Sequence, residues 1–91
     1  MTPLMIAVLL DNLKLIETLV ERGANVNAPC GPSFRQTTAL HVACVLGNLD
    51  AVRCLVELGA DVHRSDCDGM DALKIAAVRS DAETLEFLIQ V

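Results

Sequence analysis

Apolar runs alternate with short polar breaks along the chain, at spacings typical of short helices. In the first run, Leu4, Ala7 and Val8 are spaced to line one face of a helix. A side-chain oxygen just before such a run can accept a hydrogen bond from an unpaired N–H of the first helical turn. Residues with such an oxygen precede three of the runs: Thr2, Thr38 and Asp71. The pattern therefore predicts a short helix after each of them.

A second helix is predicted behind each short one, again after a capping residue. The caps are Asn12, Asn48 and Asp81, and the predicted helices run from Leu13 to Arg22, from Leu49 to Leu58 and from Ala82 to about Gln90. Gly23 and Gly59 follow the first two of these helices, at the position where a positive φ is usual.

The segments between successive helix pairs are rich in Asn, Asp, Gly, Ser and Pro, which favour turns. They run from Ala24 to Thr37 and from Ala60 to Met70. We expect both to form turns or projecting hairpin-like loops, the first of them longer by three residues.

These pieces recur with a nearly constant period. Leu4, Leu40 and Leu73 hold the same place in their helices and are 36 and 33 residues apart, while Gly23 and Gly59 keep the 36-residue offset. The longer first loop accounts for the difference, and a period of this length indicates a repeat architecture. The sequence therefore predicts a single domain over 1–91, with repeats at approximately 1–36, 37–69 and 70–91, the last of them truncated.

The middle repeat carries several landmarks at fixed offsets: Thr38-Ala39-Leu40-His41, Gly47-Asn48-Leu49 and Gly59-Ala60-Asp61-Val62. On these landmarks the chain resembles about two and a half ankyrin repeats over nearly its full length. The resemblance implies an all-α solenoid of stacked antiparallel helix pairs with projecting hairpin-like loops. It also implies that the protein works by binding another protein.

The outer repeats depart from the pattern of that family. Met5 and Lys74 stand where the family usually has His, and Asp11 and Ser80 stand where the middle repeat has Gly47. If φ is positive at those two turns, each non-glycine residue costs about 1 kcal/mol, Asp somewhat less than Ser. We therefore expect the outer repeats to be the weaker ones.

Charge and hydropathy narrow the classes of partner. The formal net charge is −5, and the seven Lys and Arg residues are scattered, whereas binding a phosphate backbone requires clustered cations. The apolar start, Met1 to Leu10, lacks a basic region and a small-residue cleavage site and is too short to span a bilayer. We therefore expect the protein to have no nucleic-acid partner. We also expect the segment from Met1 to Leu10 to be a buried helix that does not insert into a membrane.

The four cysteines are interpreted as reduced thiols. Cys44 and Cys54 fall in predicted helices, where they would pack as small hydrophobes. Cys30 and Cys67 fall on loops, and none of the four forms a CxxC pair. This usage is typical of an intracellular protein, cytoplasmic or nuclear.

No group of residues is arranged for catalysis or for holding a cofactor. The resemblance implies that His41 is a structural group bonded to the Thr38 hydroxyl and nearby backbone, while His63 is expected in solvent or against a partner. The loop cysteines and His63 have no recognised zinc spacing, and the run 66–69 lacks most ligands of a calcium loop and is expected to be a turn. The sequence therefore predicts no enzyme activity, no cofactor and no metal.

The resemblance implies a partner-binding surface with two positions from each repeat and additional residues from the loop tips. The six helix positions are Leu9, Leu10, Val45, Leu46, Val78 and Arg79, and the loop positions are Phe34, Arg35, Arg64, Cys67 and Met70. Five of the six helix positions are aliphatic, which suggests a groove rather than a solvated face. The alternative is that these side chains pack beneath the loops or against the following helix.

We expect the partner to be a protein segment that meets Leu10, Leu46 and Phe34, with arginines attracting acidic groups at the rim. A non-catalytic interaction scaffold is the first hypothesis. The alternative is a regulatory or substrate-recruiting repeat segment of a larger enzyme, adaptor or channel. An enzyme that uses Cys67 or Cys30 as nucleophile is a third reading, which the acidic loop 61–71 opposes because it would disfavour a thiolate.

The outermost helices carry apolar residues rather than the polar faces usual in terminal repeats. These residues are Ile6, Leu15, Ile16, Leu85, Phe87 and Ile89. We expect either a piece of a longer array or a small protein whose ends are covered by a partner, and we expect the uncapped ends to permit self-association.

Overall fold

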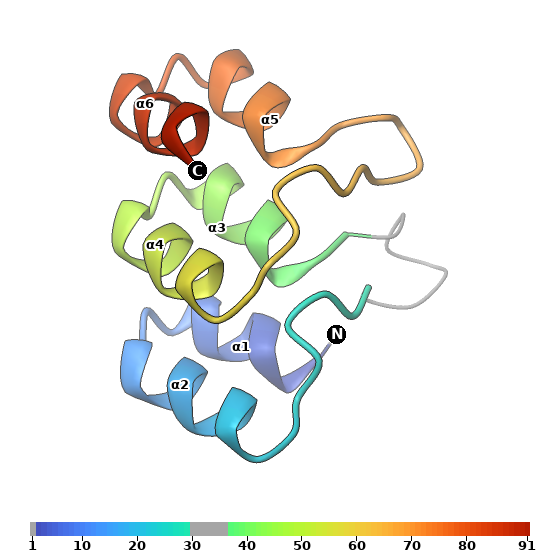
Figure 1. The fold of residues 1–91 in the computed structure, drawn as a ribbon, viewed down its shortest axis with the longest axis vertical. Helices are drawn as coiled ribbons and strands as arrows, with labels where there is room; N and C mark the ends of the chain where they lie inside the picture. The colour runs from blue at the N-terminus through green and yellow to red at the C-terminus, as the bar shows by residue number, and fades with distance from the viewer. Residues whose placement is uncertain (1, 30–36) are drawn as a thin grey trace.

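The computed structural model describes residues 2–29 and 37–91 and contains six helices in this part of the chain. They are α1 (Pro3–Leu9), α2 (Leu13–Glu21), α3 (Ala39–Leu46), α4 (Leu49–Glu57), α5 (Ala72–Val78) and α6 (Ala82–Gln90). Each odd-numbered helix forms an antiparallel pair with the helix that follows it, and the three pairs stack along the longest axis (Figure 1). The predicted all-helical solenoid is confirmed.

All six predicted caps form. Thr2 accepts a hydrogen bond from the Met5 N–H at 3.2 Å, and Asp71 accepts one from the Lys74 N–H at 2.8 Å. The remaining caps accept in the same way: Asn12, Thr38, Asn48 and Asp81. The local signals in the sequence are therefore sufficient to start every helix.

Two of the predicted helices extended one residue too far. Arg22 and Leu58 are C-cap residues, with ψ of 8° and 2°, and are not part of α2 and α4. The backbone leaves the helical region there because the next residues, Gly23 and Gly59, have φ of 97° and 103°. The helix therefore unwinds one residue before each glycine.

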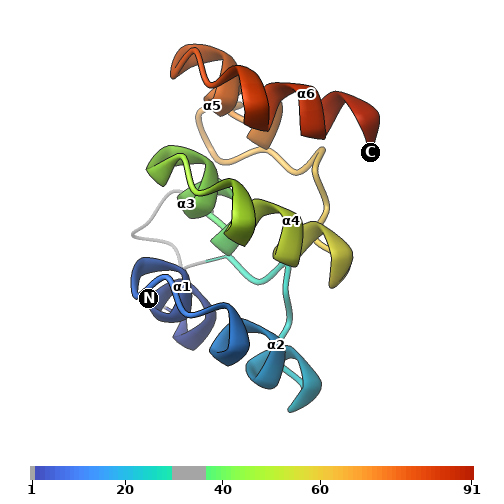
Figure 2. The same cartoon turned by 90° about the vertical axis from the view of Figure 1, so that its left-hand side faces the viewer.

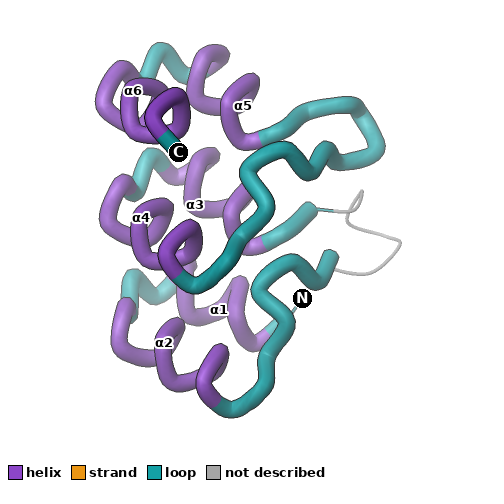
Figure 3. Tube along the Cα trace, viewed as in Figure 1, coloured by secondary structure: helices purple, strands orange, loops and turns teal. Residues whose placement is uncertain are grey.

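The helices form two layers, and the loops project from one side of the stack. Helices α1 and α5 lie on either side of α3 in one layer, and α2 and α6 lie on either side of α4 in the other (Figures 1 and 2). The loop before α5 extends beyond the α1–α3–α5 layer (Figure 3). It closes on itself where the Asp66 N–H donates to the Met70 carbonyl at 3.0 Å, which agrees with the predicted hairpin-like loop.

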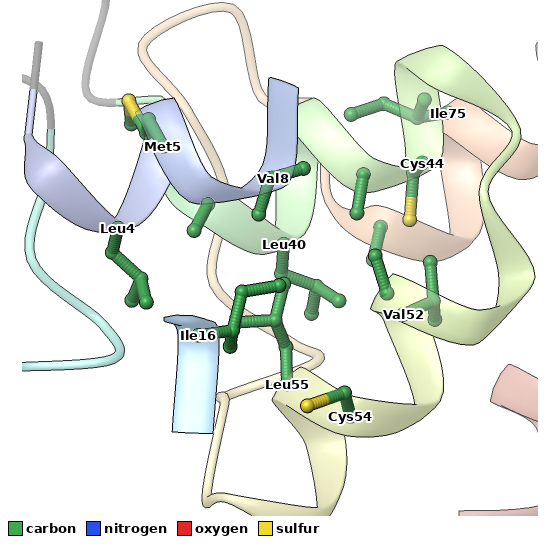
Figure 4. Close-up of a cluster of buried hydrophobic side chains, with 14 of the residues drawn as sticks. Leu4, Met5, Val8, Ile16, Leu40, Cys44, Val52, Cys54, Leu55 and Ile75 are labelled. Atoms are coloured by element: carbon green, nitrogen blue, oxygen red, sulfur yellow. The ribbon is translucent and has the colours of Figure 1, made fainter. Parts of the chain in front are cut away.

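A single buried cluster runs through all three helix pairs. Leu40 of α3, Leu55 of α4 and Ile16 of α2 lie together where the first two pairs meet (Figure 4). Small residues at the helix contacts, Ala7, Ala43 and Ala76, are fully buried and allow the layers to approach closely. Each pair is therefore stabilised by its neighbours as well as by its own contacts.

The apolar residues at the two ends differ in exposure from one another. Ile6 of α1 and Ile89 of α6 are exposed, and Leu15, Leu85 and Phe87 are partly buried. Ile16, however, is completely buried against the second pair. It was wrongly grouped with the uncapped residues, because the face of α2 that carries it points into the stack.

Candidate functional site

The tight turn between the two helices of each pair has a positive φ, so the condition for a strained turn at Asp11 and Ser80 is met. The values are 54° at Asp11, 68° at Gly47 and 56° at Ser80. The first turn is also linked to the second repeat, because the Asn48 side-chain amide donates to the Asp11 carboxylate at 2.6 Å. Asp11 therefore has a compensating contact across the repeat boundary, which helps to hold the ends of α1 and α3 side by side.

His41 is buried and both of its ring nitrogens are engaged. The Thr38 backbone N–H donates to Nδ1 at 2.9 Å, and Nε2 lies 2.8 Å from the Arg64 carbonyl oxygen. Since the N–H requires an acceptor and the carbonyl requires a donor, the proton is on Nε2. The ring also lies 3.1 Å from the Thr38 hydroxyl, so its predicted structural role is confirmed.

The six helix positions of the expected binding surface lie at the C-terminal ends of α1, α3 and α5, and we call them the ladder: Leu9, Leu10, Val45, Leu46, Val78 and Arg79. The five aliphatic members have exposed fractions between 48% at Leu46 and 76% at Val78. Side chains packed beneath loops would be far less exposed. The ladder is therefore open to solvent, and the alternative of internal packing does not hold.

Four of the predicted site residues line one cavity between α3 and α5. The cavity has a volume of about 280 Å³ and an almost wholly apolar lining, and its residues are Val45, Met70, Ile75, Val78 and Arg79. Ile75, which the sequence analysis missed, is nearly buried, whereas Val45 and Val78 are exposed. The cavity lies at the boundary between two repeats, since Val45 belongs to the second repeat and the other four residues belong to the third.

Arg79 lies across the turn of the preceding repeat. A Cβ placed on Gly47 would come within 3.3 Å of Arg79 Nη2 and within 3.6 Å of Asp81 Oδ2. Gly47 therefore meets two requirements, the positive φ and the space for this guanidinium. Hydrogen bonds from the Thr84 hydroxyl and the Thr84 N–H lower the pKa of Asp81, and the charge of Arg79 lowers it further.

The loop positions are only partly placed by the structure. Cys67 is exposed beside a turn in which the Asp66 carboxylate accepts from the Asp68 and Met70 N–H groups at 2.8 and 3.0 Å. This confirms the expected turn at 66–69. Arg64 is half-buried, and its carbonyl faces His41. Phe34 and Arg35 lie outside the described residues.

A second cavity, also of about 280 Å³, lies in the other layer, between α4 and α6. Arg53 lies over the Phe87 ring at 5.5 Å from its centroid, next to a more polar lining that includes Glu83 and Glu86. The hydrophobic pattern of the sequence does not indicate this pair. The 33-residue offset places Arg53 one position before the equivalent of Phe87, which is the signal that could have suggested a contact.

The thiols within α3 and α4 are poor nucleophiles. Burial raises the pKa of Cys44 to about 12, and the nearby charge of Asp81 adds to the shift. Burial, followed by the charges of Glu17 and Glu57, also raises the pKa of Cys54. Both act as small apolar residues of the core, as predicted from their positions.

The described residues contain neither a metal-binding cluster nor a membrane-spanning helix. Within 2–29 and 37–91, no three His, Cys, Asp or Glu side chains are grouped closely enough to hold a metal ion. None of the helices in the same ranges has the length and hydropathy needed to cross a bilayer.

Comparison with known proteins agrees with the repeat pattern. The family model that describes ankyrin repeats in three copies matches residues 4–91, which is nearly the whole chain. Such repeats are typically non-catalytic, and no catalytic domain is evident beside them. A search of curated proteins found no match.

Proposed function

Because the chain belongs to the ankyrin-repeat family, whose repeats are generally protein–protein interaction modules, we propose that it is a non-catalytic scaffold that binds a partner polypeptide along the ladder. The partner lies in the groove formed by the ends of α1, α3 and α5 and contacts the loop that precedes α5. The protein needs no cofactor for this function.

The observation that carries the proposal is the exposure of five aliphatic side chains at two adjacent positions of successive repeats. Leu9, Val45 and Val78 hold equivalent positions in successive repeats, and all three are about half or more exposed. A single exposed aliphatic residue is common on any protein, but a continuous row is characteristic of an interaction surface. Covering the row removes apolar area from water, which drives association.

Arginines at the rim of the groove favour partners that carry acidic groups. Arg79 borders the cavity, Arg64 lies in the neighbouring loop, and the proposed surface also includes Arg35 together with Phe34. Cations beside an apolar surface favour partners with acidic groups, mainly through orientation and association rate. Cys67 and Met70 complete the contact surface on the loop side.

The chemistry of the described residues supports a binding role over a catalytic one. His41 has both ring nitrogens engaged, and the lone pair of Nδ1 already accepts from the Thr38 N–H, which opposes a role as a base. The buried thiols of Cys44 and Cys54 have raised pKa values, which oppose formation of a nucleophilic thiolate. The two buried thiols are unpaired, which supports an intracellular location.

Substitution within the ladder tests the proposal. We expect the double variant Leu10→Lys with Leu46→Lys to lose capture of the partner from a cell extract, because two charges would have to be buried in the apolar groove. Both residues are exposed, so helicity measured by circular dichroism should be unchanged.

The matched control is Leu73→Lys with Ile89→Lys, which adds the same charge at two exposed aliphatic residues outside the ladder. We expect this control to capture the same proteins as the wild type. Capture by the ladder variant at the wild-type level would show that the partner binds elsewhere.

A further inference from the structure

The groove has two levels that differ in chemistry. The upper level lies between α3 and α5 and is formed by Val45, Met70, Ile75, Val78 and Arg79. The repeat register gives the equivalent positions between α1 and α3 as Leu9, Thr37, Val42, Val45 and Leu46. The level between α1 and α3, the lower level, therefore has Leu46 where the upper level has Arg79, and among these equivalent positions only the upper level has a cation.

On the basis of the proposed function, we propose that the upper level selects a specific pair of groups on the partner. The cavity of Val45, Met70, Ile75 and Val78 receives one bulky apolar side chain of an extended segment, and Arg79 binds a carboxylate a few residues away in the same segment. The partner is thus a peptide segment with an apolar anchor next to Asp or Glu.

The size of the cavity fits a side chain better than a free small molecule. Its volume of about 280 Å³ lies just below the roughly 300–1,000 Å³ of pockets that enclose whole ligands. Ile75 forms a nearly buried floor, and the exposed Val45 and Val78 form walls that a ligand would cover. Since the lining is almost wholly apolar, an aliphatic or aromatic group gains most from entering it.

Arg79 lies beside the turn of the second repeat without any partner present. Its guanidinium lies against the backbone of Gly47, at the C-terminal end of α3 where the helix dipole favours a cation. A charge that is already positioned loses little freedom on binding, which favours affinity. The turn glycine therefore contributes to recognition by leaving space for the arginine.

The charge of Arg79 remains available to a partner although Asp81 is close. The Thr84 N–H and hydroxyl donate to the two carboxylate oxygens of Asp81 at 3.3 and 2.7 Å. A guanidinium has five N–H donors and can bind a carboxylate through two of them. The Lys74 amine donates to the carbonyl of Gly69, the residue before Met70 of the cavity lining, at 3.1 Å and adds a second positive charge to the third repeat.

The difference between the levels also gives the bound segment a direction. Its acidic residue lies over Arg79 at the α5 end, and its uncharged apolar part continues over Leu46 and Leu10 toward α1. A segment bound in the opposite direction would place its carboxylate over these leucines and leave it without a hydrogen-bond partner, which is costly.

A positional-scanning library of octapeptides tests this inference, with the wild-type protein and two variants at one position. Arg79→Leu installs the residue that the other two repeats carry at this place, and Arg79→Glu reverses the charge. We expect the wild type to enrich a bulky apolar residue with Asp or Glu a few positions away. We expect Arg79→Leu to keep the apolar preference and bind the enriched peptides about tenfold more weakly. Arg79→Glu should enrich Lys or Arg in place of the acid.

Arg53→Leu and Arg53→Glu are matched controls, because they make the same changes on α4, in the other layer. We expect both to enrich the same peptides as the wild type. The Leu10→Lys with Leu46→Lys variant is screened in parallel to separate this inference from the proposed function.

Three outcomes of the peptide screen would contradict the inference. Peptides that bind the Arg79 variants as well as the wild type but fail to bind the Leu10→Lys with Leu46→Lys variant would overturn the inference and leave the groove in place. Peptides that bind all variants equally would overturn the groove as well. Failure to enrich any octapeptide would also contradict the inference, because an extended segment is the proposed ligand.

Discussion

The second and third repeats contain the same helical positions but differ sharply in how they are covered. Leu40 in α3 is 2% exposed, whereas its equivalent in α5, Leu73, is 41% exposed. Cys44 of α3 is fully buried, and its equivalent Ala77 is exposed. The second repeat has a helix pair on each side, and in the described part of the chain nothing covers the corresponding face of α5.

The comparison shows that burial in this fold belongs to the interface between repeats and not to the residue type. In a stacked array, stability is approximately the sum of intrinsic repeat terms and nearest-neighbour terms. The second repeat has two neighbour terms, the capping network of His41 and a glycine at its turn. The third has one neighbour, Lys74 in place of the histidine and Ser80 at the turn.

The largest difference is expected on truncating the equivalent leucines. Leu40→Ala should lower the free energy of unfolding by about 2–5 kcal/mol, because it opens a cavity between three helices. Leu73→Ala should lower it by less than about 1 kcal/mol, because the side chain is already partly in water. Urea denaturation followed by circular dichroism measures both, and equal losses would contradict the neighbour account.

The histidine and lysine positions should differ by a smaller amount. His41→Leu leaves the Thr38 N–H and the Arg64 carbonyl without their partner, which should cost about 1–3 kcal/mol. Lys74→Leu changes an exposed side chain and should alter stability by no more than about 0.5 kcal/mol. Thermal melts of the two variants compare these effects, and a large loss in the lysine variant would show that the third repeat depends on the same network.

Exchanging the turn residues should produce opposite effects of about 1 kcal/mol. Ser80→Gly should stabilise the protein by about that amount, since φ at this position is 56°. Gly47→Ser should destabilise it by about 1 kcal/mol or more, because the new Cβ also presses on Arg79. The shift of the denaturation midpoint gives both signs, and destabilisation by Ser80→Gly would mean that the serine side chain stabilises the turn.

The buried thiol of Cys44 should have the smallest effect on the free energy of unfolding, because it matters only well above neutral pH. Because the pKa of Cys44 is raised from 9.0 to about 12 in the folded protein, its contribution to stability is complete below pH 9 and is lost as the pH rises toward 12. Denaturation of the wild type and of Cys44→Ala across this range should show the additional loss only in the wild type. Parallel pH profiles would mean that the thiol ionises in the folded state as easily as in the unfolded state.

Alkylation separates the equivalent positions directly. In a background with Cys30→Ser, Cys54→Ala and Cys67→Ser, Cys44 should react with iodoacetamide only as fast as the protein opens, whereas the thiol introduced by Ala77→Cys should react as a free thiol does. Rapid modification of Cys44 would contradict its burial between the repeats.

The sequence was sufficient for the features that depend on short spans of chain. Caps such as Thr38 follow from residues within a few positions of one another, whereas the pairing of His41 with Thr38 came from the family resemblance. The ladder positions came from the register of the repeat family, and the structure places the aliphatic members in solvent.

Features that depend on how one repeat lies over the next could not be predicted. The contact of Arg79 with Gly47 spans 32 residues, and the Asn48–Asp11 hydrogen bond spans 37. Such contacts depend on the distance and angle between stacked pairs, which the hydrophobic pattern does not specify. The cavity floor at Ile75 and the Arg53–Phe87 pair escaped prediction for the same reason.

The central claim is that a partner segment lies along the ends of α1, α3 and α5. Amide chemical-shift mapping by NMR during titration with a bound segment tests it most directly. The account predicts that the largest shifts cluster at Leu10, Val45, Leu46, Val78 and Arg79. Shifts concentrated on α2, α4 and α6, with these five residues unchanged, would contradict it.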